Sequence, residues 1–282
     1  VMPALGRLID GFRGMGAPVI YTRCASLRGE LWIEDTTDVV DLEVLSNLTD
    51  IVDGGLDLIG NTELTNVRGL RNLRGVVLID EVWIQGNPKL GSLDGLEGIV
   101  ELGEKLGWSL YISSNAVLAF IDGLSGVSGV LPGALQVNQN PTLVSFDGLE
   151  GVTGIAGFDE DGNSIYIESN DVLRSVAALD NVQGDLPGAF VVWNNPVLES
   201  PQGLHGIHAA GTEAAFQGYA VYILGNSALC ATPDEASALR TMCETSAGYG
   251  VGNVDYCAPA SDAEWWDSSR CEGKRTRLLV SP

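Results

Sequence analysis

The acidic loop Asp159-Glu160-Asp161-Gly162-Asn163 has the residue types of a metal site. Carboxylate and amide oxygens are the ligands that calcium prefers, so Asp159, Asp161 and Asn163 are candidate calcium ligands. The glycine of this loop, however, comes two positions too early for the helix–loop–helix calcium pattern. A solvated acidic turn is the interpretation that we favour, and we therefore expect no resident cofactor.

Cysteine is the second residue type that could carry chemistry. The chain has five cysteines, at Cys24, Cys230, Cys243, Cys257 and Cys271. The last four are separated by 13, 14 and 14 residues, which does not fit the paired short spacings of a zinc site. We therefore expect disulfides that staple an irregular cap, and an oxidising compartment. The sequence leaves the pairing open, and the odd total leaves one cysteine over.

A short pattern that recurs eight times indicates the elements that position these residues. It has two apolar residues separated by one position, then two positions, an asparagine, two positions and a leucine, and the weaker first copy has Thr36 in place of the asparagine. The copies start 25, 26, 28, 25, 30, 25 and 31 residues apart. The copies begin at Leu31, Leu56, Val82, Leu110, Leu135, Ile165, Phe190 and Val221. Alternating apolar residues predict a strand with one buried face, and stacked coils of this length share one core. The pattern predicts a mainly β chain, a parallel β-solenoid of about eight coils.

The recurring asparagine and the segments between copies have different expected roles. Seven asparagines at one corner of successive coils predict a structural ladder of amide side chains rather than a functional site. Most copies continue with an apolar residue and then Gly-Leu. Length varies after this element, at residues 101–108, 157–163 and 205–219. Such insertions in solenoids form loops on one face, often the working face.

The repeat stops after Leu229, and Thr232-Pro233-Asp234-Glu235 has the residues of a helix start. We expect a helix across the open end of the stack, because a solenoid must cover its last coil. The predicted organisation is a lead-in at residues 1–23, a solenoid at 24–230, and a cysteine-rich, disulfide-stapled helical cap with a tail at 231–282.

The ordered series of copies resembles the receptor L domain, a leucine-rich right-handed β-helix found in insulin-receptor and epidermal-growth-factor-receptor ectodomains and in fungal cell-wall proteins. Cys24 before the first coil resembles the start of that domain, and Cys230 before a helix resembles its close. Ordinary leucine-rich repeats place the asparagine one residue closer to the next leucine and fit less well. The resemblance implies an extracellular binding or structural module and no catalyst. Receptor signalling is not implied, because this sequence contains neither a kinase nor a transmembrane segment.

The strand positions between the two buried residues are predicted to point outward on one sheet face. Together with the next outward positions they carry six large aromatic residues: Trp32, Trp83, Tyr111, Tyr166, Trp193 and Tyr222. Aromatic rings stack on sugars or anchor protein partners, so these six are the candidate binding residues. The alternative is that aromatics merely suit exposed strand positions and stack on one another.

Catalysis on a β-helix would need carboxylates clustered on one face, or acids beside lysine or arginine. The predicted face offers only Glu34, Asp57 and Glu168, and neither lysine nor arginine is expected on it. The sequence also has neither a phosphate-binding loop nor a Gly-x-Ser-x-Gly turn. We therefore expect no enzyme, and a β-helix polysaccharide-active enzyme is the weakest alternative.

The composition of the chain limits the classes of partner that it is expected to bind. The 282 residues include 15 Lys and Arg against 37 Asp and Glu, a formal net charge of −22. Nucleic acids and anionic membranes attract clustered positive charge, so neither is an expected partner. No apolar run approaches the 18 residues of a membrane-spanning helix, and no direct membrane insertion is expected.

These observations predict a secreted or cell-surface recognition or adhesion module that binds a protein or a glycan through its aromatic sheet face. The alternative is a structural subunit of a filament, wall or matrix, in which copies of the chain cover that face. Asn47-Leu48-Thr49 is a candidate glycosylation site, which is consistent with secretion.

Overall fold

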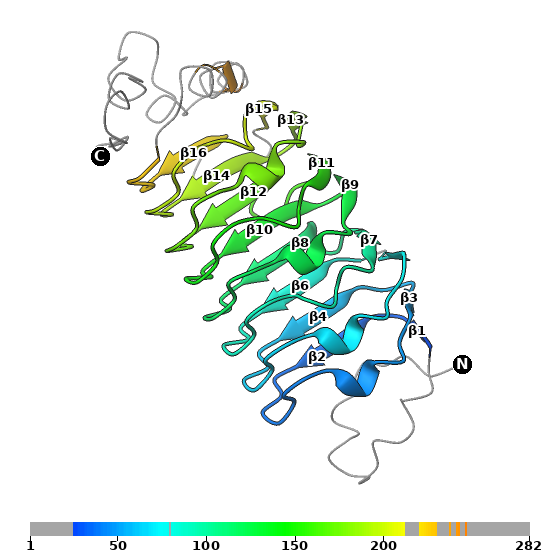
Figure 1. Cartoon of the computed structure of the whole chain (residues 1–282). Helices are drawn as coiled ribbons and strands as arrows, with labels where there is room; N and C mark the ends of the chain where they lie inside the picture. Colours follow the sequence, from blue (N-terminus) through cyan, green and yellow to red (C-terminus); the bar gives the residue numbers. More distant parts are fainter. Residues whose placement is uncertain are drawn as a thin grey trace.

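The structure, a computed structural model, describes residues 25–78, 80–211 and 220–229, together with Ser237, Thr241, Met242 and Ser246. Within these residues the chain is mainly β and winds into a parallel solenoid (Figure 1). All five cysteines lie outside the described residues. The predicted disulfides, the lead-in and most of the cap therefore remain predictions.

The predicted repeats form one eight-stranded parallel sheet in sequence order (Figure 1). Its strands are β2 (Leu31–Glu34), β4 (Leu56–Ile59), β6 (Val82–Gln85), β8 (Trp108–Ser113), β10 (Ala134–Asn138), β12 (Asn163–Glu168), β14 (Ala189–Trp193) and β16 (Val221–Leu224). Equivalent residues pair from coil to coil, as Leu31 does with Leu56 and Leu56 with Val82. Eight strands delimit about seven complete turns, so the solenoid has about seven turns rather than the predicted eight coils.

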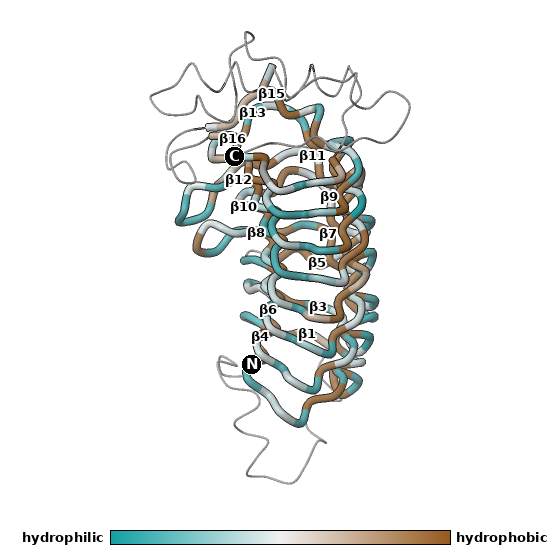
Figure 2. The backbone as a smooth tube through the Cα atoms, turned by 90° about the vertical axis from the view of Figure 1, so that its left-hand side faces the viewer, coloured by the Kyte–Doolittle hydropathy of each residue, from teal (hydrophilic) through white to brown (hydrophobic). Residues whose placement is uncertain are grey.

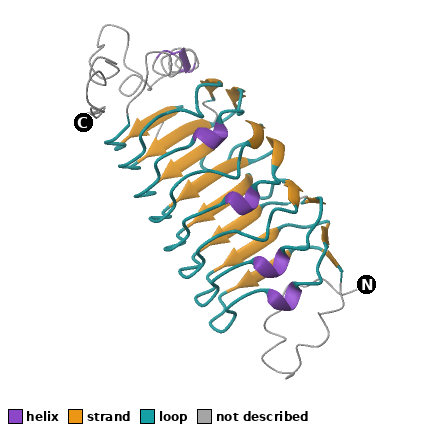
Figure 3. Cartoon of the chain, viewed as in Figure 1, coloured by secondary structure: helices purple, strands orange, loops and turns teal. Residues whose placement is uncertain are grey.

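In the described residues, the other sides of the stack carry shorter elements. Four two-stranded pairs join β1 (Ser26–Arg28) to β3 (Asp50–Val52), β5 (Val76–Val77) to β7 (Ile99–Glu101), β9 (Ser128–Leu131) to β11 (Gly151–Ile155), and β13 (Gly184–Leu186) to β15 (Ile207–Ala210). Four short 3₁₀ helices lie along another side of the stack (Figure 3): η2 (Glu43–Leu45), η3 (Arg68–Leu70), η4 (Asp122–Leu124) and η5 (Ala177–Leu179).

The Gly-Leu element of the repeat lies where adjacent coils touch. A Cβ atom on Gly69 would overlap the backbone carbonyl of Leu42, and one on Gly123 would overlap that of Leu93. Glycine is needed because it allows this backbone approach. The leucine that follows, such as Leu124 in η4, is buried in the interior.

Apolar side chains from all the coils form one continuous core. Figure 2 shows the hydrophobic positions as bands that run along the stack. Met242 extends this core beyond the last strand, and the backbone N–H of Ala210 in β15 donates to Ser246 Oγ at 2.8 Å. The four described residues of the segment 231–282 are helical. Three of them lie within the predicted cap helix, which was expected to end at about residue 243, and Ser246 lies just beyond it.

The predicted amide ladder is confirmed. From Asn87 onward, each corner asparagine accepts on its Oδ1 from the backbone N–H and Nδ2 of the asparagine one coil earlier, as Asn87 does from Asn61 at 3.1 Å for both bonds. The same Nδ2 of Asn61 also donates to the Ile33 carbonyl at 2.9 Å. The ladder comprises Asn61, Asn87, Asn115, Asn140, Asn170, Asn195 and Asn226, all buried. Thr36 begins it by donating its hydroxyl to Asn61 Oδ1 at 2.7 Å.

Candidate functional site

The outer face of the eight-stranded sheet carries one residue of each strand in a single row. The row runs, in register, through Trp32, Asp57, Trp83, Tyr111, Gln136, Tyr166, Val191 and Tyr222. Hydrophobic residues on both sides of each row position are buried in the core. The predicted strand register is therefore confirmed. The members of the row nevertheless differ in their surroundings.

Three aromatic residues near the middle of the face form an aromatic cluster: Trp83, Trp108 and Tyr111. The ring centroids of Trp83 and Tyr111 lie 4.5 Å apart, and Trp108 packs edge-on against them at 5.4 and 5.5 Å. The Trp108 indole N–H donates to Gln136 Oε1 at 2.9 Å, and that of Trp83 donates to Gln85 Oε1 at 2.9 Å. The indole N–H groups are thus satisfied by amides of the same face, and the rings are held in place.

The aromatic residues at the other end of the face form a second group. Trp193 and Tyr222 pack edge-to-face at 5.9 Å, and Tyr222 and Tyr166 pack with the buried Val191 and Ala189. Tyr222 is only 5% exposed, so the expectation that its ring is exposed on this face is wrong, while its role in binding stays a prediction. Its strand position does point outward, but its neighbours on that face cover it. Trp32, at the opposite end, is 41% exposed.

The insertion at residues 101–108 brings further side chains to this face. The backbones of Lys105 and Trp108 exchange two hydrogen bonds, at 3.0 and 3.1 Å, around Leu106 and Gly107. These two central residues have φ of 52° and 91°, the positive pair of a type I′ turn. Residues paired directly across such a turn present their side chains on the same side. The turn therefore directs Lys105 and Trp108 together toward the sheet face.

Three carboxylates form an acidic cluster at the start of the first three sheet strands: Glu30, Asp57 and Glu81. Glu30 and Glu81 directly precede β2 and β6, and Asp57 is the second residue of β4. One oxygen from each lies within 4.8 Å of the others. Asp57 is 4% exposed and Glu81 1%. Within the described residues, Asp57 Oδ1 and both carboxylate oxygens of Glu81 have no hydrogen-bond partner.

Lys105 is the cation that the structure places at this cluster. Its Nζ forms an ion pair and hydrogen bond with Glu30 Oε1, and lies 3.6 Å from Glu81 Oε1 and 3.8 Å from Asp57 Oδ2. The expectation that no lysine or arginine would reach this face is therefore wrong. Lys105 was missed because it belongs to an insertion loop, whereas only strand residues were assigned to the face.

The surroundings of the cluster shift the pKa values of its members. Burial, then the hydrogen bond and charge of Glu30 and the charge of Glu81, raise the pKa of Asp57 to about 8. Burial also raises the pKa of Glu81. Burial opposes ionisation of Glu30, but hydrogen bonds with Asp57 and Lys105 lower its pKa overall. At neutral pH the pair Glu30 and Asp57 thus shares one proton, held mainly on Asp57.

The second insertion contains the predicted calcium loop. Asp159 is buried, and its Oδ1 accepts the backbone N–H groups of Asp161 and Asn163 at 3.0 and 2.8 Å. The Asn163 amide donates to both oxygens of Asp159. Asp159 therefore closes its own turn, which is the role of an acidic turn rather than of an open ligand set. The loop also reaches the first insertion, because a Cβ on Gly107 would lie 2.6 Å from the Phe158 carbonyl.

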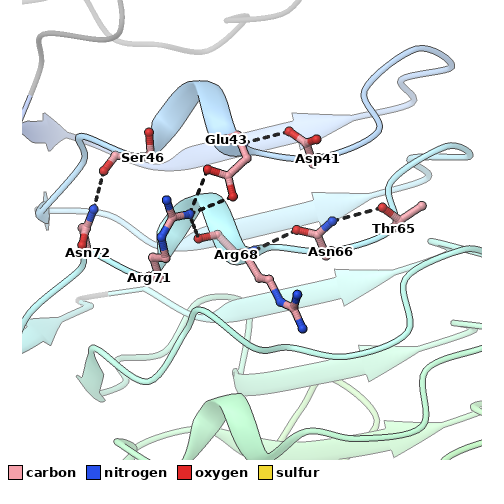
Figure 4. Close-up of polar contacts among 8 residues, drawn as sticks. All are labelled: Asp41, Glu43, Ser46, Thr65, Asn66, Arg68, Arg71 and Asn72. Carbon is pink, nitrogen blue, oxygen red and sulfur yellow. Dashed lines mark hydrogen bonds and ion pairs between the residues drawn. The ribbon is translucent and has the colours of Figure 1, made fainter.

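The helical side of the stack shows how polar side chains of adjacent coils pair elsewhere (Figure 4). Arg71 Nη1 donates to both oxygens of Glu43, at 2.8 and 2.9 Å, and to the carbonyl of Arg68. Asn72 Nδ2 donates to the Ser46 carbonyl at 2.6 Å. The Arg71–Glu43 pair is exposed and both partners are hydrogen-bonded. The acidic cluster differs from this pair because Asp57 and Glu81 are buried and have carboxylate oxygens without a hydrogen-bond donor in the described residues.

No model of a known protein family matches this chain, and neither curated proteins nor solved structures gave a match. A functional assignment therefore rests on the sequence and on the geometry of the sheet face. No helix in the described part of the chain is long and apolar enough to cross a membrane.

Proposed function

We propose that this chain is an extracellular recognition module, similar to receptor L domains, that binds a glycan or a protein through the outer face of its eight-stranded sheet. The observation that carries the proposal is the aromatic cluster of Trp83, Trp108 and Tyr111. Rigid rings bordered by amides can stack on a sugar or anchor a partner side chain with little loss of conformational entropy on binding.

The candidate binding residues fall into two groups, one in each half of the sheet face. Trp32, Trp83 and Tyr111 form the half that we assign to ligand binding, and Trp108, which is only 7% exposed, packs against Trp83 and Tyr111 and holds their rings in place. Tyr166 and Trp193 lie beside the buried Tyr222, so we assign these three to packing at the other end. Asn47 is exposed in the turn after η2, where a glycan could be attached without entering the sheet face.

A binding role is favoured over catalysis by the burial of the acidic cluster. A general acid or base must reach the atom to which it transfers a proton. Asp57 and Glu81 are nearly inaccessible to solvent, so a polysaccharide could not contact them in this conformation.

The decisive experiment is a screen of glycans and cell-surface proteins with wild type and a variant carrying Trp83→Ser and Tyr111→Ser. We expect the variant to lose at least about tenfold in affinity, because hot-spot aromatics carry most of the binding energy. Phe120→Ser is the matched control, since Phe120 is an exposed aromatic residue outside the sheet. Equal binding by the double variant and wild type would contradict the proposal.

Light scattering of the unreduced protein distinguishes a recognition module from the alternative, a structural subunit of a filament, wall or matrix. Self-association that the Trp83→Ser and Tyr111→Ser changes abolish would identify a structural subunit whose copies cover the face. A monomer at all concentrations supports recognition of a different molecule. The compartment has its own test: alkylation without reductant is expected to leave at most one of the five cysteines modified, and five modified cysteines would contradict secretion.

A further inference from the structure

We propose that the acidic cluster of Glu30, Asp57 and Glu81 binds a divalent cation of the calcium class, and that Lys105 is an internal cation which the metal displaces. This site adjoins the ligand-binding rings, because Asp57 lies between Trp32 and Trp83 in the outward row, but the inference does not depend on the recognition function.

The first argument is the reach of the ligands. Two oxygens on opposite sides of one calcium ion are separated by twice the calcium–oxygen distance of about 2.3–2.6 Å, which is about 4.6–5.2 Å. The ligand oxygens of Glu30, Asp57 and Glu81 lie within 4.8 Å of one another. An ion at the centre of three oxygens spaced at this upper limit would lie about 2.8 Å from each, so side-chain shifts of a few tenths of an ångström bring all three carboxylates within the calcium–oxygen distance. Three carboxylates offer six hard oxygen atoms, the ligand type that calcium prefers.

The second argument is the unpaired state of the buried oxygens. Both oxygens of Glu81 and Oδ1 of Asp57 lack a hydrogen-bond donor among the described residues, although both side chains are more than nine-tenths buried. Burying a carboxylate without a partner costs free energy, and buried charges are normally paired or bound to metals. The Lys105 ammonium lies 3.6 Å from Glu81, too far for a hydrogen bond.

The third argument is the balance of charge. Lys105 contributes one positive charge to a site with three carboxyl groups, of which Glu30 and Asp57 share one proton at neutral pH, and Asp80 adds a negative charge beside Glu81. Metal binding is expected to release the shared proton, because a metal ligand must be deprotonated. A divalent ion supplies twice the charge of the ammonium and can approach the oxygens of Asp57 and Glu81 more closely than Lys105 Nζ does at 3.8 and 3.6 Å. Electrostatic attraction therefore favours exchange of Lys105 for the metal when the metal is available.

The fourth argument is access. The side chain of Lys105 is 34% exposed, and Lys105 directly precedes the two central turn residues Leu106 and Gly107. Its side chain can therefore move into solvent. Glu30 is also part-exposed, whereas Asp57 and Glu81 form the floor. Lys105 and Trp108 flank the same two-residue turn, and departure of Lys105 is expected to change the surroundings of the Trp108 ring. Tryptophan fluorescence therefore provides a second readout.

The test is calorimetric titration of the chelator-treated full chain with calcium chloride, in parallel with three variants. We expect one saturable site in wild type, and a change in tryptophan emission with the same midpoint. Lys105→Met is expected to bind about tenfold more tightly, because the competing internal cation is gone. Glu81→Gln, which keeps the size and removes one ligand charge, is expected to bind at least about tenfold more weakly. Asp161→Asn is the control for the acidic loop and is expected to bind as wild type does.

Two outcomes would overturn the proposal. The first is the absence of saturable binding in both wild type and Lys105→Met. The second is binding that Glu81→Gln leaves unchanged, which would place the ion elsewhere. Circular dichroism of each variant checks that the solenoid is folded, so that loss of binding is not caused by unfolding.

Discussion

The asparagine ladder and the acidic cluster are two sets of buried polar side chains stacked on successive coils, and they differ in how their polar atoms are paired. Each asparagine of the ladder from Asn61 to Asn195 accepts and donates within the stack and carries no charge. The acidic cluster carries charge, and three of its buried oxygens are without hydrogen-bond donors in the described structure. The two sets are similarly buried, but only the ladder has hydrogen-bond partners for its buried polar atoms.

This difference separates a stabilising feature from one whose role must be sought outside folding. A fully connected buried amide network fixes the register of the coils and strengthens each of its bonds. A buried carboxylate without donors lowers the stability of the fold. Stability therefore does not account for Glu81, and occupancy by a cation does.

The largest expected effect comes from breaking the ladder. Asn140→Ala removes the acceptor of Asn115 and the donor to the Ile112 carbonyl, leaving buried groups unpaired. We expect a loss of about 3 kcal/mol in the free energy of unfolding, measured by chemical denaturation. Asn181→Ala is the control, because exposed Asn181 donates one bond to the Glu150 carbonyl. Equal losses of stability in Asn140→Ala and Asn181→Ala would contradict the claim that the buried ladder stabilises the fold more than an exposed hydrogen bond does.

The next effect is a dependence of stability on pH that arises in the acidic cluster. The pKa of Asp57 is about 8 in the folded chain and 3.8 when unperturbed. Between these values the folded state holds a proton that the unfolded state has lost, so this contribution to stability falls as pH rises toward 8 and is constant above it. Glu30, Glu81 and Lys105 face the same group, and the raised pKa of Glu81 acts in the same direction.

This prediction is measured as the midpoint of thermal unfolding in chelator between pH 5 and 9. Wild type is expected to lose several degrees over this window, and Asp57→Asn to lose less, because the variant has no proton to release at this position. A midpoint that falls equally in both proteins would show that other groups cause the dependence.

The smallest effect is expected on the helical side. Arg71→Ala removes the exposed ion pair with Glu43, and exposed pairs contribute little because water and salt screen them. We expect a change of at most about 0.5 kcal/mol in the free energy of unfolding, measured beside Asn140→Ala under identical conditions. A loss comparable to that of Asn140→Ala would mean that surface pairs, rather than the buried ladder, hold the coils together.

The fold could be predicted from the sequence because the repeat states it many times. Alternation at positions such as Leu56 and Leu58 gives the strands, and the recurring asparagine gives the corner and its ladder. The glycine of Gly-Leu was recognised as part of the repeat, although its reason, contact with the preceding coil at Gly69, needed the structure.

The acidic cluster could not be predicted in the same way, because its members occupy different positions in their coils. Asp57 lies in the outward row, whereas Glu30 and Glu81 lie just before their strands. Lys105 reaches them from an insertion whose type I′ turn is signalled only by Gly107. Trp108 likewise joins the face through a bulge between β8 and β10, which strict alternation does not anticipate. The burial of Tyr222 depends on neighbours in other coils and not on its own strand.

The most direct test of the cation site is a pair of crystal structures of the wild-type chain, one grown with calcium and one with chelator. We predict that calcium produces a density peak about 2.3–2.6 Å from oxygens of Glu30, Asp57 and Glu81, with the Lys105 side chain displaced into solvent. In chelator, Lys105 is expected to contact Glu30 as in the present structure. A Lys105 that keeps this contact in both crystals, with no ion among the three carboxylates, would contradict the account.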